Sequence, residues 1–167
     1  MTVYLALGAN LGDRRANLIA ALGRLPPLVR VEAVSALYES PPQPPAPPPA
    51  YLNAAARVET ELEPEALLSY LKQIEHDIGR RAGERWAPRP IDLDIALYDD
   101  RVVDSETLQI PHPRLPDRAF VLRPLLDIEP DLVHPVGGER LDAMLERVGE
   151  DELLRVADRQ WAGRPSG

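Results

Sequence analysis

The sequence predicts an α+β fold in which helices cover both faces of a mainly antiparallel sheet. Short apolar or alternating segments predict strands at residues 3–7, 29–38, 51–62 and 91–98. Apolar residues at helical spacing predict helices at residues 13–25 and 64–78. The resulting order of strand, helix, strand, strand, helix and strand is the βαββαβ order of a ferredoxin-like core, which we expect to form an α/β/α sandwich.

In the N-terminal half, glycine and proline mark where the predicted helices and strands begin and end. The first strand ends at Gly8, and Pro26 stops the helix that follows it. Residues 41–49 include seven prolines, which favour a stiff, extended loop and exclude a helix or a central strand. The second helix begins at Pro64, and Gly79 is expected to end it.

The C-terminal half begins with a polar, arginine-rich loop that leads into the strand at residues 91–98. We expect an extended loop at residues 110–113, a helix over residues 117–126 that is short or kinked because it contains Pro124, and a helix at residues 141–148. The residues after about 150 carry no functional signal.

Composition limits the possible functions. A chain of 167 residues suits one domain, so residues 1–167 are treated as one unit. The chain has no cysteine, which excludes disulfides, iron–sulfur clusters and thiolate metal sites. It shows no signal peptide and no membrane span, so we expect a soluble, cytoplasmic protein. Its formal net charge of −8 argues against binding to nucleic acid.

The strongest chemical signal is the pair Asp92 and Asp94 in the strand at residues 91–98. Residues two apart share one face of a strand, which puts their Cα atoms about 6–7 Å apart. The alternate residues, Leu93, Ile95 and Leu97 among them, would face the core. Aspartate is a poor strand former, and a solvated outer face remains the simplest alternative. Two carboxylates with oxygen-rich surroundings also fit Mg²⁺.

Four arginines lie within residues 80–89, directly before this strand: Arg80, Arg81, Arg85 and Arg89. Arginine forms bidentate contacts with phosphate, and these charges would neutralise what remains on a magnesium-bound triphosphate. Surface solubility or a general preference for arginine is the alternative. Gly79 and Gly83 could act as hinges, and Trp86 could close the loop over phosphates or simply pack on the core.

The remaining signals are weaker. His112 lies between two prolines in an extended loop, which suits a phosphate contact. The glycine-rich turn at residues 8–13 lacks the lysine of a P-loop. Three dispersed histidines without cysteine argue against a zinc site, and no combination of serine, histidine and acid indicates a hydrolase.

Several segments together resemble one family, the 6-hydroxymethyl-7,8-dihydropterin pyrophosphokinases of folate biosynthesis. The resemblance runs in order from about residue 3 to 135 and is most specific at Glu84-Arg85-Trp86-Ala87-Pro88-Arg89-Pro90-Ile91-Asp92-Leu93-Asp94-Ile95. The other matching segments are Leu7-Gly8-Ala9-Asn10-Leu11-Gly12, Tyr38-Glu39-Ser40-Pro41-Pro42, Tyr51-Leu52-Asn53-Ala54-Ala55, Pro111-His112-Pro113-Arg114 and Arg118-Ala119-Phe120-Val121-Leu122.

The resemblance implies a single pyrophosphokinase domain over residues 1–167 that transfers pyrophosphate from MgATP to the pterin hydroxymethyl group and releases AMP. We also expect the protein to be a monomer. It implies two Mg²⁺ ions on Asp92 and Asp94, and catalytic roles for Arg80, Arg89, Asp92 and Asp94. The pterin contacts it implies are Ser40, Pro41, Tyr51, Asn53, Trp86 and Phe120. The ATP contacts it implies are Glu75, Arg80, Arg81, Arg85, Trp86, Arg89, Ile95, Gln109, His112 and Arg118.

Two other classes of protein remain open from the sequence. A palm-type nucleotidyl transferase also carries strand carboxylates on a ferredoxin-like sheet, but it would release pyrophosphate and would usually need a basic surface. A non-catalytic ferredoxin-like binding module would bind a small molecule without turnover.

Overall fold

The structure is a computed structural model that describes residues 1–10, 12–41, 50–81 and 90–163, with only the backbone of residues 80 and 81. Its strands are β1 (Thr2–Ala9), β2 (Val29–Val34), β3 (Leu37–Ser40), β4 (Tyr51–Thr60), β5 (Asp92–Tyr98), β6 (Val103–Asp104), β7 (Gln109–Ile110) and β8 (Leu154–Ala157). Its helices are α1 (Arg14–Gly23), α2 (Pro64–Arg81), α3 (Ala119–Ile128), α4 (Leu141–Val148) and the 3-10 turn η1 (Leu115–Asp117).

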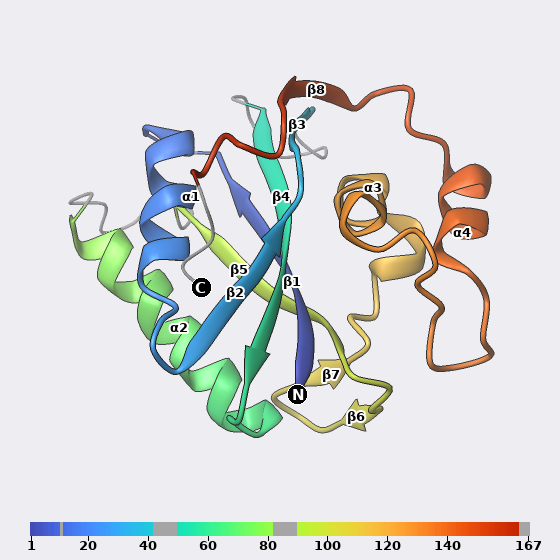
Figure 1. Ribbon diagram of the computed structural model, residues 1–167, viewed down its shortest axis with the longest axis horizontal. Coiled ribbons are helices and arrows are strands. Elements are labelled where there is room, and N and C mark those ends of the chain that lie inside the picture. Colours follow the sequence, from blue (N-terminus) through green and yellow to red (C-terminus); the bar gives the residue numbers. More distant parts are fainter. Residues whose placement is uncertain (11, 42–49, 82–89, 164–167) are drawn as a thin grey trace.

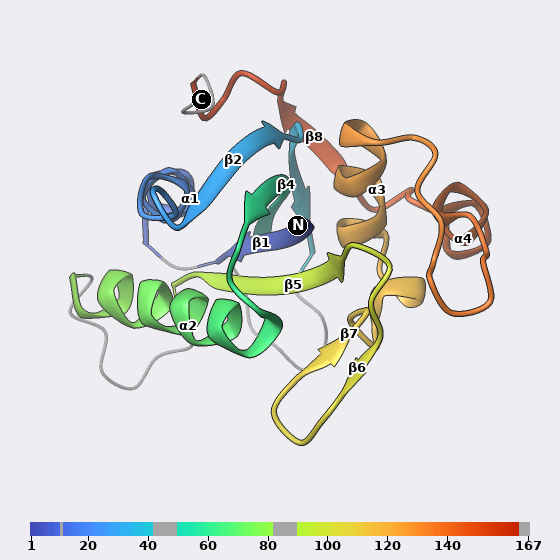
Figure 2. The same cartoon turned by 60° about the horizontal axis from the view of Figure 1, so that its bottom comes forward.

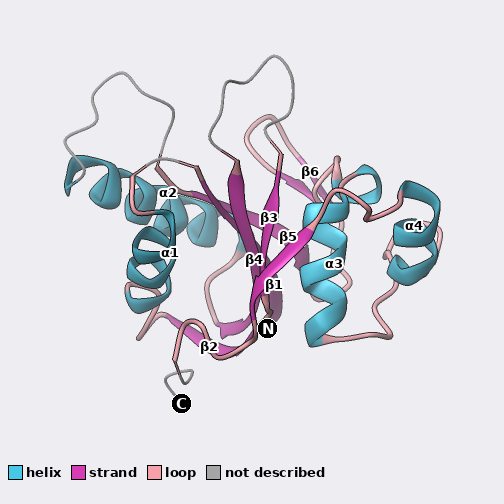
Figure 3. Cartoon of the chain, turned by 90° about the horizontal axis from the view of Figure 1, so that it is seen from above, coloured by secondary structure: helices cyan, strands magenta, loops and turns pink. Residues whose placement is uncertain are grey.

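The main sheet is antiparallel and has the strand order β5-β1-β4-β3-β8, while β2 pairs with the other half of β4. Helices α1 and α2 cover one face of the sheet, and α3 and α4 lie on the other (Figures 1 and 3). The predicted α/β/α sandwich with a ferredoxin-like βαββαβ core is therefore confirmed. Figure 2 shows the small β6–β7 ribbon beyond the end of β5.

Alternation along the strands divides the apolar residues between two cores. Leu5 and Leu93 pack into the core beneath α1 and α2, together with Leu71 of α2. Tyr4 packs instead with Leu122 beneath α3 and α4. Because Leu93 faces the first core, its neighbours Asp92 and Asp94 face the side of the sheet that carries α3.

A bulge near the end of β5 changes this alternation. Tyr4 lies opposite Leu97 while Leu5 lies opposite Ile95, so Ala96 is the extra residue. Leu97 consequently joins the core under α3 and α4, whereas Ile95 stays with the core under α1 and α2. The prediction that Leu97 shares a face with Leu93 and Ile95 was wrong for Leu97, because a strict period of two cannot anticipate a bulge.

Three other sequence predictions need correction. The single strand expected at residues 29–38 is two strands, because the Ser35 side chain accepts a hydrogen bond from Ala55 N at 2.8 Å and donates one to Ala36 O. Helix α2 continues through Gly79 to Arg81 instead of ending at the glycine. Helix α3 contains Pro124 as predicted, but it runs from Ala119 to Ile128, which is two residues later at both ends than residues 117–126.

The segment after residue 150 is part of the sheet. Strand β8 pairs with β3, and Trp161 donates its indole N–H to Ser35 O at 2.8 Å. The Tyr38 hydroxyl donates to Asp127 Oδ2 at 2.7 Å and so links β3 to α3. Strand β3 is therefore held by β8 along its edge and by α3 through the Tyr38 side chain.

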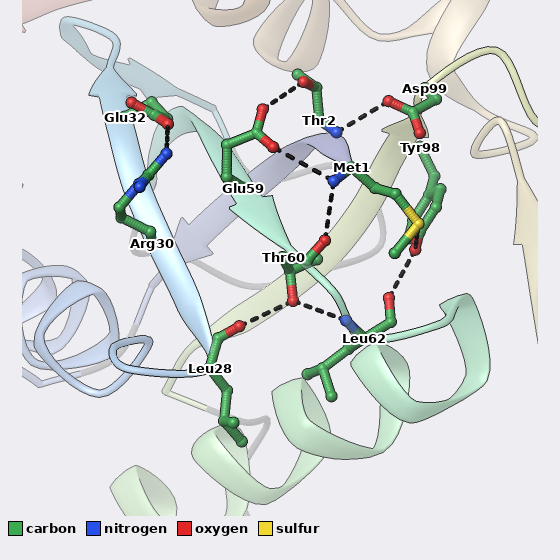
Figure 4. A network of polar contacts seen from close by, with 10 residues as sticks. All are labelled: Met1, Thr2, Leu28, Arg30, Glu32, Glu59, Thr60, Leu62, Tyr98 and Asp99. Carbon is green, nitrogen blue, oxygen red and sulfur yellow. Dashed lines mark hydrogen bonds and ion pairs between the residues drawn. The ribbon is translucent and has the colours of Figure 1, made fainter.

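The far end of the sheet is fastened by a separate polar network (Figure 4). Thr2 N donates to Asp99 Oδ1 at 2.8 Å, the Tyr98 hydroxyl donates to Leu62 O at 2.6 Å, and the Thr60 hydroxyl donates to Leu28 O at 2.9 Å. This network joins β1, β4 and β5 at the end of the sheet opposite Gly8. Of the helices in the described part of the chain, none has the length and apolar character that crossing a membrane requires.

Candidate active site

A cavity of about 290 Å³ lies at the Gly8 end of the sheet, on the side that carries α3. It is lined by the ends of β1, β3, β4 and β5, the loop after β7, and the first turn of α3. The predicted site residues that line it are Ser40, Pro41, Tyr51, Asn53, Asp92, Asp94, His112, Arg118 and Phe120. Predicted residues from distant parts of the sequence therefore line one cavity.

A second cavity of about 420 Å³ adjoins the first on the side of the β6–β7 ribbon. Its lining includes the predicted residues Ile95 and Gln109, together with Lys72 from α2. Asp94 and His112 line both cavities, so the two spaces share a wall.

The two aspartates sit opposite small residues of β1. Asp92 pairs in register with Gly8, and Asp94 pairs with Ala6. Both carboxylates are half-buried. Ala6 and Gly8 also line the first cavity, so the absence of large side chains on β1 leaves space in front of the carboxylates.

The outer edge of β5 is held by two hydrogen bonds. Leu93 N, between the two aspartates, donates to Glu75 Oε2 at 2.7 Å, and His112 N donates to Ala96 O at 3.1 Å. Glu75 is only 2% exposed, and Lys72 Nζ lies 3.4 Å from its Oε1. In the described part of the chain Glu75 lines neither cavity. Its visible role is to support the aspartate strand, and direct contact with ATP stays a prediction.

The geometry around His112 leaves its Nε2 as a hydrogen-bond donor. Its Nδ1 accepts from Arg114 N at 3.1 Å, which places the proton of the neutral ring on Nε2. Burial lowers the pKa of His112 below its ordinary value of 6.5, although the nearby Asp94 charge opposes this shift. The ring is therefore neutral at pH 7 and offers an Nε2–H group.

Arg118 brings a partly desolvated positive charge to the same cavity. Burial, followed by the nearby charge of Arg114, lowers the pKa of Arg118. Its guanidinium carbon lies 5.4 Å from the centroid of the Phe120 ring. An anionic ligand would offset this desolvation, so the arrangement favours a phosphate.

Asn53 also lines this cavity, is 4% exposed, and donates from Nδ2 to Ser40 Oγ at 2.8 Å. The rings of Tyr51 and Phe120 both line this cavity. A planar ligand with hydrogen-bonding ring edges would find aromatic faces and a buried amide here.

Some predicted residues lie outside the described part of the chain. These are Arg85, Trp86 and Arg89, and also the proline-rich residues 42–49 and the hinge Gly83. The backbone of Arg80 and Arg81 forms the end of α2, but their side chains are outside the description. Their roles remain predictions.

The donor set fits Mg²⁺. Within the described residues, no group of three or more histidine, aspartate, glutamate or cysteine side chains gathers to hold an ion. Of the described residues that line the first cavity, Asp92 and Asp94 could hold the ion with their carboxylates, and water and phosphate oxygens would complete the coordination, as Mg²⁺ prefers.

Sequence reasoning did not single out Lys72 as a site residue. It is the only lysine in the chain and lies three positions before Glu75 on a helix. That spacing brings the two side chains together and could have marked the pair.

Comparison with known proteins decides the family. Residues 4–130 match the 7,8-dihydro-6-hydroxymethylpterin-pyrophosphokinase (HPPK) family. The chain belongs to this family. As a member of the HPPK family it is a pyrophosphokinase, an ATP-dependent diphosphotransferase of folate biosynthesis. The nucleotidyl transferase and the non-catalytic binding module are not favoured.

Relatives of similar length support the assignment. The 2-amino-4-hydroxy-6-hydroxymethyldihydropteridine pyrophosphokinase of Haemophilus influenzae is 43% identical over 158 residues, which cover 93% of this chain and 98% of that protein. The enzyme of the same name from Aquifex aeolicus is 40% identical over 135 residues, covering 81% of this chain and 84% of that protein.

Other relatives are much longer. The Folic acid synthesis protein fol1 of Pneumocystis carinii is 43% identical over 92% of this chain, but the match spans only 21% of that protein. A solved Plasmodium falciparum HPPK-DHPS structure aligns with a TM-score of 0.73 and 15% identity over 92% of this chain and 48% of that one. This likeness shows the fold alone.

Proposed function

We propose that the two adjoining cavities bind the two substrates of one pyrophosphoryl transfer, with the reacting phosphates at their common wall. The pterin would occupy the end with Asn53, and the adenosine of ATP would occupy the cavity with Gln109. The observation that carries this proposal is that Asp94 and His112 line both cavities. A group can be transferred directly from one substrate to the other only where the two bound substrates meet, and residues that line both cavities mark that place.

The pterin end would recognise shape and hydrogen bonds. Tyr51 and Phe120 would enclose the plane of the ring, and Asn53 would bond to its edge after exchanging its contact with Ser40. Ser40 and Pro41 would add contacts from the end of β3. A ligand lacking the matching ring edge would gain no hydrogen bond from Asn53, whose amide would keep its contact with Ser40, and this difference would give selectivity.

At the common wall of the two cavities, metal ions and side chains would neutralise the charge of the ATP triphosphate. Asp92 and Asp94 would hold Mg²⁺, and we propose two ions; bound Mg²⁺ supplies neutralisation of the triphosphate and polarisation of its oxygens. His112 would donate its Nε2–H to a phosphate oxygen, and Arg118 would pair with another. The arginines of residues 80–89 and Trp86 would complete the triphosphate site and close over it.

The transfer itself exchanges one phosphorus–oxygen bond for another. The pterin hydroxymethyl oxygen attacks the β-phosphorus of ATP, and the bond from that phosphorus to the oxygen bridging the α-phosphate breaks. AMP leaves, and the hydroxyl proton is released. The residues act by positioning both substrates and stabilising charge.

We propose that residues 1–167 act as a single, monomeric pyrophosphokinase domain of the cytoplasm with no nucleic-acid or membrane partner. The formal net charge of −8 supports the absence of a nucleic-acid partner.

Product analysis tests the proposal. The protein would be incubated with MgATP and 6-hydroxymethyl-7,8-dihydropterin, and the products resolved by phosphorus NMR. We expect AMP and a pterin diphosphate in equal amounts. ADP would show that the γ-phosphorus is attacked and would overturn the proposed arrangement.

Two variants test whether the reaction takes place at this site. Asp94→Asn is expected to reduce the rate by about a thousandfold, as loss of charge stabilisation at a reacting centre commonly does. Asp100→Asn, in the exposed turn just after β5, is the matched control and should keep full activity.

A further inference from the structure

Arg14 joins the two chain segments that lead into the first cavity. This residue begins α1, and its Nη1 donates to Ala50 O at 2.7 Å. Its Nη2 lies 3.1 Å from Glu39 Oε2. The Arg14 and Glu39 side chains are 27% and 32% exposed, so the contact is partly shielded from water.

The two partners of Arg14 directly precede residues that line the first cavity. The pairing of β3 with β4 ends at Ser40 opposite Tyr51. Glu39 directly precedes Ser40, and Ala50 directly precedes Tyr51. Both Ser40 and Tyr51 line the first cavity, so one guanidinium binds both strands within one residue of the cavity wall.

The Arg14 side chain adds a link at this end of the β3–β4 pair. Within the described residues, Arg14 contacts the chain on both sides of the place where the pairing of β3 with β4 ends. A guanidinium is planar and carries several donors, so it can bond a carboxylate and a carbonyl at once. A single ammonium group is a poorer substitute.

We propose that Arg14 is a positioning residue that sets the separation of Ser40 and Tyr51 and thereby the affinity for the pterin. It does not line the cavity and acts through the residues on either side of it. The inference rests on the proposed placement of the pterin in the first cavity, in contact with Ser40 and Tyr51. It assigns a functional role to the start of α1, for which the sequence motifs gave no chemistry.

The test compares Arg14→Ala and Arg14→Lys with the wild type. The KM values for the pterin and for MgATP are measured, and the Kd of the pterin is measured by calorimetry. We expect Arg14→Ala to raise the pterin KM and Kd about tenfold, which corresponds to about 1.4 kcal/mol, and to leave the MgATP KM within about twofold. Arg14→Lys should fall between Arg14→Ala and the wild type.

Arg15→Ala is the matched control. Arg15 follows on the same helix but donates to Trp161 O, at 3.4 Å, and so touches neither Glu39 nor Ala50 in the described structure. We expect its substrate constants to match those of the wild type.

A pterin KM and Kd unchanged in Arg14→Ala would overturn the inference, as would a parallel rise in both substrate constants. If the alanine variant does not fold, the lysine variant decides: wild-type pterin affinity would refute the role of the guanidinium. Pterin binding requires no turnover, so this result is separate from whether the protein forms AMP. A wild type that binds the pterin without producing AMP would refute the proposed function and leave the Arg14 test valid.

Discussion

Glu75 provides the sharpest test of how the aspartate strand is held. Replacing it with alanine removes the acceptor of the Leu93 N–H, a group on a residue that is 1% exposed. An unsatisfied buried donor costs about 1–3 kcal/mol, and each buried methylene lost adds about 0.8 kcal/mol. We expect Glu75→Ala to lower the free energy of unfolding by about 3 kcal/mol. For a chain of this size that corresponds to a fall in melting temperature of about 6–12 °C.

The conservative variant separates the hydrogen bond from the charge. Glu75→Gln keeps an acceptor oxygen for Leu93 N and should cost about 1 kcal/mol. The assay is urea unfolding followed by circular dichroism, with Glu146→Ala on the exposed face of α4 as the control. If Glu75→Ala were as stable as the control, the carboxylate would not be supporting β5, and this account of the strand would be wrong.

Two further predictions concern titration. Burial and the hydrogen bond to Asp127 raise the pKa of Tyr38 to about 12, above its ordinary value of 10. The folded state therefore holds this proton more tightly, so stability from Tyr38 is complete below pH 10 and is lost as the pH rises toward 12. Ultraviolet titration should show a lower pKa for Tyr38 in Asp127→Asn, and an unchanged value would contradict the contact. For His112, burial lowers the pKa below 6.5, so its stability contribution is complete above that pH and is lost on acidification. In the metal-free protein, Asp94→Asn should lower this pKa further, because the Asp94 charge raises it; NMR titration would show this, and a rise would refute it.

Much of the site could be predicted because its residues lie on regular elements. The alternation around Asp92 and Asp94 placed both carboxylates on one face, and Leu93 is buried on the other, as expected. The family motifs then indicated Asn53 and His112, and the structure places these residues in one cavity with the aspartates.

Other features depend on contacts that a local pattern does not contain. The bulge at Ala96 moves Leu97 to the opposite core, and only the register of β5 against β1 reveals it. Gly79 lies within α2, because a glycine weakens a helix without necessarily ending it.

Long-range pairing explains the remaining omissions. Strand β8 has exposed Leu154 and Val156, so its sequence resembles a surface segment, and its partner β3 lies more than a hundred residues away. Two contacts that the sequence analysis missed have a backbone group as one partner: Arg14 donates to Ala50 O, and Glu75 accepts from Leu93 N. Such partners leave no mark on the sequence pattern.

The central claim is that Asp92 and Asp94 hold the metal ions at the wall between the two substrates. The most direct measurement is the number of Mn²⁺ ions bound per chain in the presence of the pterin and a non-hydrolysable ATP analogue, counted by electron paramagnetic resonance. The account predicts two ions in the wild type and in Asp100→Asn, and fewer in Asp94→Asn together with loss of AMP formation. Two ions and full activity in Asp94→Asn would contradict it.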